Sequence, residues 1–231
     1  MRQVRLSQRL YLLALTLFTL CATLLPAQND GDERAPWILA EHDLQSEAAS
    51  EDIARIIRSG YLPVGIEYQE GTLVTLYLDQ PGVKIDQWAI QEFERLDNLN
   101  AELSQPMLEG WVPMDISKTS SGLTVMFVKT DDIEIEGWNI AIGPVETESI
   151  GQTFAAWRER GYTAYGTTLS ENDEIWYLML EIAGQESVPR VFFDGYPEGE
   201  VSDGITAQME GGGIPWGLMT IGENTFIHYL F

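Results

Sequence analysis

The feature that most constrains the fold is a short motif that returns about every fifty residues. Four glycines are spaced 50, 51 and 51 residues apart, and the residues after them read YLPVGI, WVPMDI, YTAYGT and GIPWGL. These glycines are Gly60, Gly110, Gly161 and Gly212. Self-similarity at a fixed period is the signature of a repeat architecture, in which neighbouring units bury the apolar faces that one unit leaves open.

A helix is predicted before each of these glycines. Apolar residues stand seven positions before the glycine and again three or four positions before it, which places them on one helical face. The residues at the seventh position are Ile53, Leu103, Phe154 and Ile205. Glycine at the end of the helix permits a left-handed C-terminal cap. In the first copy Ser50 is the expected N-cap, and the short, glycine-rich fourth helix is typical of an end unit.

Two strands are predicted after each glycine, and one aromatic strand before each helix. The second strands, TLVTLYL, LTVMFV, IWYLML and TFIHYLF, are apolar on both faces, which favours burial on both sides. The aromatic landmarks before the helices are Trp37, Trp88, Trp138 and, more weakly, Tyr196. Because the tryptophans recur in register, we expect them to pack in the core. The sequence therefore predicts an α+β fold, a single repeat domain at 37–231 with units 37–87, 88–137, 138–195 and 196–231.

The N-terminal segment has the pattern of a secretory signal peptide. Arg2, Arg5 and Arg9 precede an uncharged apolar run that ends near Pro26 and Ala27. We expect a signal peptide at 1–27 and an acidic linker at 28–36, with an uncleaved anchor as the alternative. The one cysteine, Cys21, falls within this segment. An exported chain without disulfides favours a bacterial periplasm or cell exterior.

Charge restricts the class of partner. The chain has 36 acidic and 13 basic residues, and the expected signal peptide carries three of the basic residues and none of the acidic ones. Nucleic acid and anionic membrane surfaces are not expected partners, because binding to them needs a basic face. An acid-rich surface that stays soluble in salt also fits a saline habitat, with an ordinary acidic exported protein as the alternative.

The repeated unit resembles a known family. The first copy, from Trp37 through His42 and Leu44 to Gly60 and Tyr61, is similar to the bacterial tandem repeat domain family. Units of that family have about fifty residues, a leading tryptophan, a helix, a Gly-Tyr pair and paired strands. The resemblance implies an extracellular, non-catalytic domain that is sometimes joined to hydrolases, and it supplies no catalytic residue.

No residue pattern points to a particular reaction or cofactor. His42 and His228 are far apart in the sequence, and no serine stands in a G-x-S-x-G motif. No cofactor is expected. Asp131, Asp132 and Glu134 are weak calcium candidates, since the acidic stretch lacks the spacing of a twelve-residue calcium loop. The sequence favours an exported, non-catalytic acidic module that binds a protein or glycan. A carboxylate-dependent hydrolase of the glycosidase type and a structural envelope component are the alternatives.

Overall fold

Each repeated unit is built in the order strand, helix, strand, strand. In the first unit these elements are β1 (Trp37–Asp43), α1 (Ala48–Arg58), β2 (Tyr61–Gln69) and β3 (Thr72–Asp79). Gly60, between α1 and β2, has a φ of +90°, a conformation that glycine adopts without a steric cost. Gly110, Gly161 and Gly212 have φ values of +83°, +94° and +90° at the same place in their units. The chain therefore leaves all four helices by the same left-handed turn.

The structure, a computed structural model, describes residues 34–94, 99–120, 122–170, 173–185 and 187–231. The expected signal peptide at 1–27 and most of the expected linker at 28–36 lie outside these residues. Residues 34–231 form one compact unit.

Three further units follow the first. The second contains β4 (Gln87–Phe93), α2 (Leu99–Leu108), β5 (Trp111–Lys118) and β6 (Leu123–Lys129). The third contains β7 (Ile135–Pro144), α3 (Thr147–Arg158), β8 (Thr163–Leu169) and β9 (Glu174–Ile182). The fourth contains β10 (Val191–Pro197), α4 (Val201–Glu210), β11 (Ile214–Ile221) and β12 (Asn224–Leu230).

The three strands of each unit form one small antiparallel sheet. The strand orders are β1-β3-β2, β4-β6-β5, β7-β9-β8 and β10-β12-β11. The last strand of each unit is thus central, and it is buried along most of its length in β3, β6 and β9. The apolar residues on both faces of these strands predicted that position. We call β2, β5, β8 and β11 the inner strands and β1, β4, β7 and β10 the outer strands.

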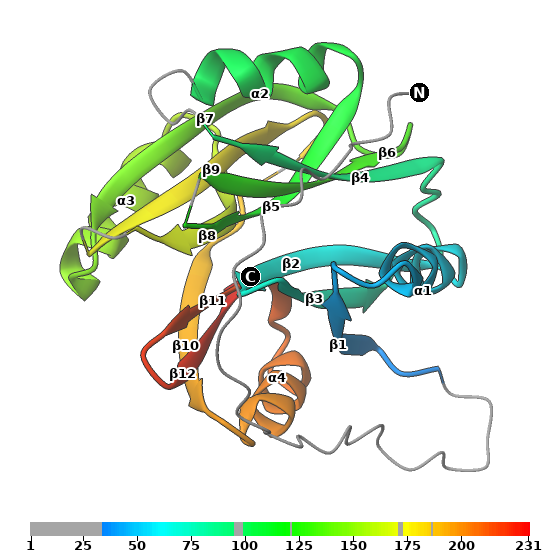
Figure 1. The fold of residues 1–231 in the computed structure, drawn as a ribbon. Coiled ribbons are helices and arrows are strands. Elements are labelled where there is room, and N and C mark those ends of the chain that lie inside the picture. The colour runs from blue at the N-terminus through cyan, green and yellow to red at the C-terminus, as the bar shows by residue number, and fades with distance from the viewer. Residues whose placement is uncertain (1–33, 95–98, 121, 171–172, 186) are drawn as a thin grey trace. The chain divides into compact units, whose positions relative to one another are not determined.

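The inner strands close the four sheets into a ring. β2 contacts β5, β5 contacts β8, β8 contacts β11, and β11 contacts β2 again. Each inner strand carries a register irregularity at the same place, for example between Pro63 and Gly65 or between Pro113 and Asp115. Figure 1 shows the sheets around this centre, with one helix on the outside of each. Radial repetition of this kind, which β-propellers also use, leaves no terminal unit.

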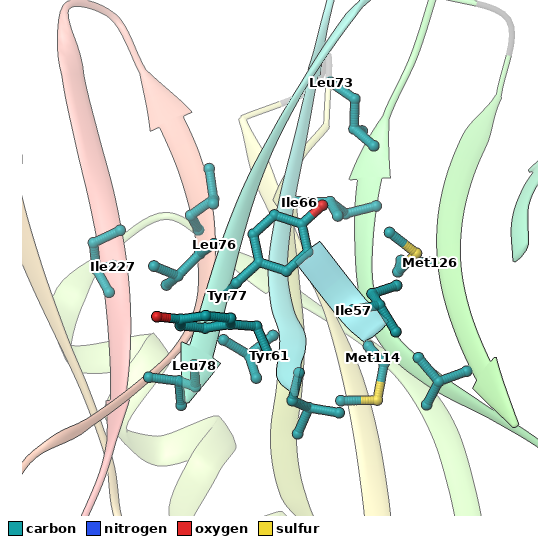
Figure 2. Packing of buried hydrophobic residues seen from close by; sticks show 14 of the residues in the cluster. Ile57, Tyr61, Ile66, Leu73, Leu76, Tyr77, Leu78, Met114, Met126 and Ile227 are labelled. Atoms are coloured by element: carbon teal, nitrogen blue, oxygen red, sulfur yellow. The ribbon is translucent and has the colours of Figure 1, made fainter. Parts of the chain in front are cut away.

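The core is shared between units rather than divided among them. In the cluster of Figure 2, Tyr77 and Ile66 of the first unit pack with Met114 and Met126 of the second and Ile227 of the fourth. All five side chains are at most 1% exposed. Burial of this cluster therefore depends on residues of three units.

The expected α+β class is wrong, because the fold is predominantly β. Strands hold 50% of the described residues and helices 22%. The helices are short and lie outside the ring, while the sheets meet one another through their inner strands. Helices and strands were both predicted, but the sequence pattern did not show that contacts between strands build the centre. No helix of the described residues is long and apolar enough to cross a membrane.

Candidate functional site

A buried carboxylate lies where the four inner strands meet. The Asp115 side chain on β5 is fully buried. Its Oδ1 accepts the N–H groups of Ile116 at 2.7 Å and Thr167 at 3.0 Å. Its Oδ2 accepts those of Ile66 at 2.7 Å and Leu218 at 3.4 Å. The four donors come one from each unit, so this carboxylate ties the whole ring together.

The four donors occupy equivalent positions, each six residues after the glycine that ends a helix. The residue before each donor is Gly65, Asp115, Gly166 or Gly217. A Cβ at Gly65 would lie 3.0 Å from the Cα of Gly217, and one at Gly166 would lie 2.6 Å from Oδ1 of Asp115. The centre of the ring therefore has room for one side chain, and Asp115 supplies it.

A second polar layer lies at the position one residue after each of the four N–H donors. Ser117 Oγ accepts the Tyr68 N–H at 2.8 Å, and Thr168 Oγ1 accepts the Lys118 N–H at 2.7 Å. Glu67 accepts the Thr220 N–H at 3.3 Å, which joins the first unit to the last. At the equivalent place in the fourth unit stands Met219, whose thioether is only a weak acceptor. We call Glu67, Asp115, Ser117 and Thr168 the axial cluster.

Burial changes the acidity of both carboxylates of the axial cluster. Desolvation raises the pKa of Asp115 well above its usual range, against the opposing effect of its four N–H donors. Desolvation also raises the pKa of Glu67 to about 7, against hydrogen bonds from Thr220 and Ser117. A carboxyl group with a pKa near neutrality is a candidate acid or base. Neither of the two cavities described below is lined by Glu67 or Asp115.

The helix residues that the repeat pattern singled out face the core to different degrees. Ile53, Leu103 and Ile205 are fully buried, whereas Phe154 is half-buried. Phe154 stacks on Phe193 with the ring centroids 5.7 Å apart. The equivalent helix position thus faces the core in the first, second and fourth units. In the third unit it lies beside an opening.

The tryptophan landmarks lie on the outer strands and are half-buried. Trp37, Trp88 and Trp138 pair in register with Leu78, Val128 and Leu180 of the central strands. In the fourth unit the same register position belongs to Val191, which pairs with Leu230. Tyr196 stands five residues further on, where its hydroxyl contacts that of Tyr229 at 3.1 Å. Valine therefore replaces the tryptophan in the fourth unit.

The calcium candidates Asp131, Asp132 and Glu134 lie between β6 and β7. The Asp132 carboxylate accepts the Lys84 N–H at 2.7 Å, so it anchors the preceding loop. Among the residues that the structure describes, no group of three or more His, Cys, Asp and Glu side chains is placed to hold a metal ion.

Both histidines are buried in the fold. His42 Nε2 lies 2.9 Å from the Tyr77 hydroxyl, and burial lowers the pKa of His42. Desolvation lowers the pKa of His228 to about 3, so this fully buried ring is neutral at physiological pH. The His228 ring packs at Gly217, where a Cβ would lie 2.6 Å from it.

Two cavities lie at equivalent places, each between the helix of one unit and the outer strand of the next. The α1–β4 cavity, of about 290 Å³, is lined by Ser46, Glu47, Ser50, Ile53, Trp88 and Ile90 among others. The α3–β10 cavity, of about 210 Å³, is lined by Phe154, Arg158, Ala164, Met179, Arg190 and Val191 among others. The same architectural position therefore carries an acidic residue and a tryptophan in one case, and two arginines and a valine in the other.

The sequence contained signals for the residues that the repeat pattern did not single out. When the four units are aligned, the position of Asp115 holds glycine in the other three units. Glycine at three equivalent positions indicates a crowded site, and the aspartate is the exception. Arg158 and Arg190 are two of 13 basic residues, and Arg190 ends the extra residues of the third unit. Both arginines come together only in the folded chain, so their proximity had no local signal.

No protein-family model matches the chain, and no curated protein matches it either. Nothing in these comparisons bears on the resemblance to the bacterial tandem repeat domains, which stays a prediction. Function is therefore inferred from the residues and their geometry alone.

Proposed function

We propose that the chain is an exported, non-catalytic module that binds a basic protein partner through an acidic outer surface. The observation that carries this proposal is the excess of acids: even if all 13 basic residues were paired, most of the 36 acidic residues would keep their charge unneutralised. Clustered charge of one sign steers oppositely charged partners and speeds their encounter. The pattern of residues 1–27 supports export.

The placement of the acids supports the same conclusion. Each helix lies outside the ring and carries an acidic residue in its first turn: Glu51, Glu102, Glu148 and Asp203. Glu51, Glu148 and Asp203 are exposed, and Glu102 is half-buried. An acid at this position also stabilises the helix N-terminus. The exposed charges remain accessible to a partner.

The interior argues against the hydrolase alternative. A glycosidase needs two carboxyl groups that flank a bound sugar. Glu47 is the one carboxylate that lines the α1–β4 cavity, and none lines the α3–β10 cavity. Asp115 is saturated by backbone N–H groups in a space without room for a substrate. A binding role for the outer surface is therefore the better supported proposal.

The test is a pull-down from bacterial envelope extract with two baits. One bait is the mature chain, and the other carries Glu51→Gln, Glu102→Gln, Glu148→Gln and Asp203→Asn. At about 0.1 M salt the first bait should retain a basic protein, which about 1 M salt should release because screening shortens the reach of the charges. The second bait should retain less of the same protein.

A control bait separates position from total charge. Glu70, Asp131, Glu198 and Glu223 are exposed residues outside the helices, and neutralising them removes the same charge. Retention that resists about 1 M salt and is equal for all three baits would contradict the proposal. Hydrolysis of a glycan panel that is lost in Glu67→Gln would instead support the hydrolase.

A further inference from the structure

The lining of the α3–β10 cavity differs from that of its counterpart because the fourth unit departs from the repeat. Trp88 on the outer strand of the second unit lines the corresponding α1–β4 cavity. At the same register position the fourth unit has Val191, which is smaller. The chain between β9 and β10 adds Pro189 and Arg190 to the opening. This departure gives the α3–β10 cavity a chemistry that its counterpart does not have.

The walls of the cavity are apolar and its charged groups are both basic. Phe154, Ala164, Met179 and Val191 supply the apolar surface. Arg158 and Arg190 are exposed at its edge. The Arg158 Nε donates to the Val188 carbonyl at 3.2 Å, which fixes the guanidinium against the β9–β10 connection. Within the described part of the chain no carboxylate forms an ion pair with either arginine.

Two arginines beside an apolar hollow are notable in a chain with 36 acids and 13 basic residues. Acids are numerous enough to neutralise both groups, yet among the described residues neither arginine has an ion-pair partner. Guanidinium groups bind carboxylates through paired, charge-assisted hydrogen bonds. The volume of about 210 Å³ is below the usual range for drug-sized ligands, so the ligand is small.

We propose that the α3–β10 cavity binds the carboxylate of a small apolar acid. The carboxylate lies between Arg158 and Arg190, and the apolar part packs against Phe154, Ala164 and Met179. The same chemistry is offered by a free branched-chain acid and by the C-terminal leucine of a peptide. The inference does not depend on the acidic outer surface, because it concerns two arginines at the end of α3 and just before β10, whereas the acid of that helix, Glu148, stands in its first turn.

The test uses two carboxylate probes and their neutral amides in calorimetric titrations of the mature chain. The free acid is 4-methylpentanoate, and the peptide terminus is represented by N-acetyl-L-leucine. At about 0.15 M salt at least one acid should bind with a dissociation constant of about 1 mM or tighter. Its amide should bind at least about tenfold more weakly, because it lacks the charge that the arginines recognise. The acid that binds more tightly identifies the source.

Three arginine variants locate the site. Arg190→Gln and Arg158→Gln should each weaken binding by about tenfold or more. Arg160→Gln is the matched control, because it removes the same charge from a nearby residue that does not line the cavity. The Arg160 guanidinium lies over the Trp157 ring, 5.2 Å from its centroid. Affinity in this variant should stay within about twofold of the wild type, since screening weakens charges at a distance.

A steric variant tests the cavity without touching a charge. Gly151 lines the cavity from within α3, and a Cβ added there meets no atom within 4 Å. Leucine at this position has a better helix propensity than glycine, so Gly151→Leu should fold at least as well as the wild type. Its side chain should fill the hollow and abolish binding, with an unchanged or raised melting temperature.

Several results would overturn the proposal. The first is that neither acid binds at about 10 mM, well above the expected dissociation constant. The second is that an amide binds as tightly as its acid. The third is that Arg160→Gln weakens binding as much as Arg190→Gln, which would show that general charge, and not this cavity, attracts the acid.

Discussion

The inner and outer strands of the same sheets have opposite roles. The inner strand β2 is buried over its first six residues, and β8 is buried over six of seven. The outer strands β1 and β10 are mostly exposed or half-buried, and Leu39 and Phe192 on them are 37% and 48% exposed. Burial therefore falls from the centre of the ring to its rim.

The buried inner strands and the exposed rim are expected to serve different purposes: the inner strands stabilise the fold, and the rim binds ligands or partners. The inner strands carry Asp115, whose four N–H partners hold the units together. The rim carries the features that differ between units, such as Trp88 in one cavity and Val191 with Arg190 in the other. Changes at the centre should therefore cost folding free energy, whereas changes at the rim should alter binding.

The largest effect is expected from Asp115→Asn. The amide NH2 group would replace one carboxylate oxygen and leave two buried N–H donors without an acceptor. An unsatisfied buried group costs about 1–3 kcal/mol, so the free energy of unfolding in urea should fall by about 2–6 kcal/mol. The exposed Asp131→Asn is the control and should change it by less than about 0.5 kcal/mol. Equal stability of Asp115→Asn and the wild type would show that these bonds do not hold the ring.

Truncation of the core helix residues should come next in size. Ile53→Ala, Leu103→Ala and Ile205→Ala should each lower the free energy of unfolding by about 2–5 kcal/mol, because all three side chains are fully buried. Phe154→Ala should cost less than its size suggests, since Phe154 lines the α3–β10 cavity. Urea titrations of the four variants measure the loss in the free energy of unfolding. A much smaller loss for Ile205→Ala would indicate that the fourth unit is a loose end and that the ring is open.

The pH dependence should distinguish the buried carboxylates from the surface acids. The pKa of Glu67 is raised to about 7, so the folded state binds more protons than the unfolded state between about pH 4.5 and 7. This group therefore adds stability as the pH falls through that window, at no more than about 1.4 kcal/mol per pH unit. The lowered pKa of His228, about 3, opposes it below about pH 6.5, because the unfolded imidazole takes up a proton.

Glu67→Gln isolates that contribution. On acidification from about pH 6.5 to 5, the variant should lose stability relative to the wild type by about 1–2 kcal/mol, because only the His effect remains at these two sites. Chemical unfolding at each pH measures the difference. Parallel pH profiles for the two proteins would contradict the raised pKa of Glu67.

The smallest effect is expected from salt. Sodium chloride should raise the melting temperature at pH 7 by a few degrees up to about 1 M, because screening weakens repulsion between acids on the compact chain. The bait variant with neutral helix acids should show a flatter rise, whereas Glu67→Gln should change the rise less, since it removes a single half-buried group. A melting temperature that falls with salt would show that the surface acids do not repel one another, and would remove the argument for a saline habitat.

The local parts of the fold could be predicted from the sequence. Glycine at the end of each helix and the apolar second strands are local patterns, and they indicated the left-handed turns and the central strands. The N-cap was less well defined: Ser50 was expected, but α1 begins at Ala48, whose N–H is accepted by Ser46 Oγ at 3.2 Å. Helix ends commonly differ by such a margin, because several polar residues near the start compete.

The long-range parts could not be predicted. Closure of the ring depends on a contact between β11 and β2, which are separated by most of the chain. No periodicity distinguishes a closed array from an open one, so the sequence alone predicts an end unit for the fourth copy. The sequence pattern also points to Tyr196 as the aromatic landmark, whereas the residue in the tryptophan register is Val191. The lining of the α3–β10 cavity depends on that substitution and on two arginines that come together only in the folded chain.

Native-state amide hydrogen exchange of Ile66, Ile116, Thr167 and Leu218 tests the closed ring most directly. These four N–H groups share the Asp115 carboxylate, so none can open without disturbing the others. All four should exchange only through global unfolding, with opening free energies that agree within about 1 kcal/mol. Exchange at Leu218 that is faster than at Ile116 by more than about 2 kcal/mol of opening free energy would contradict the account, because the fourth unit would then detach while the others stay folded.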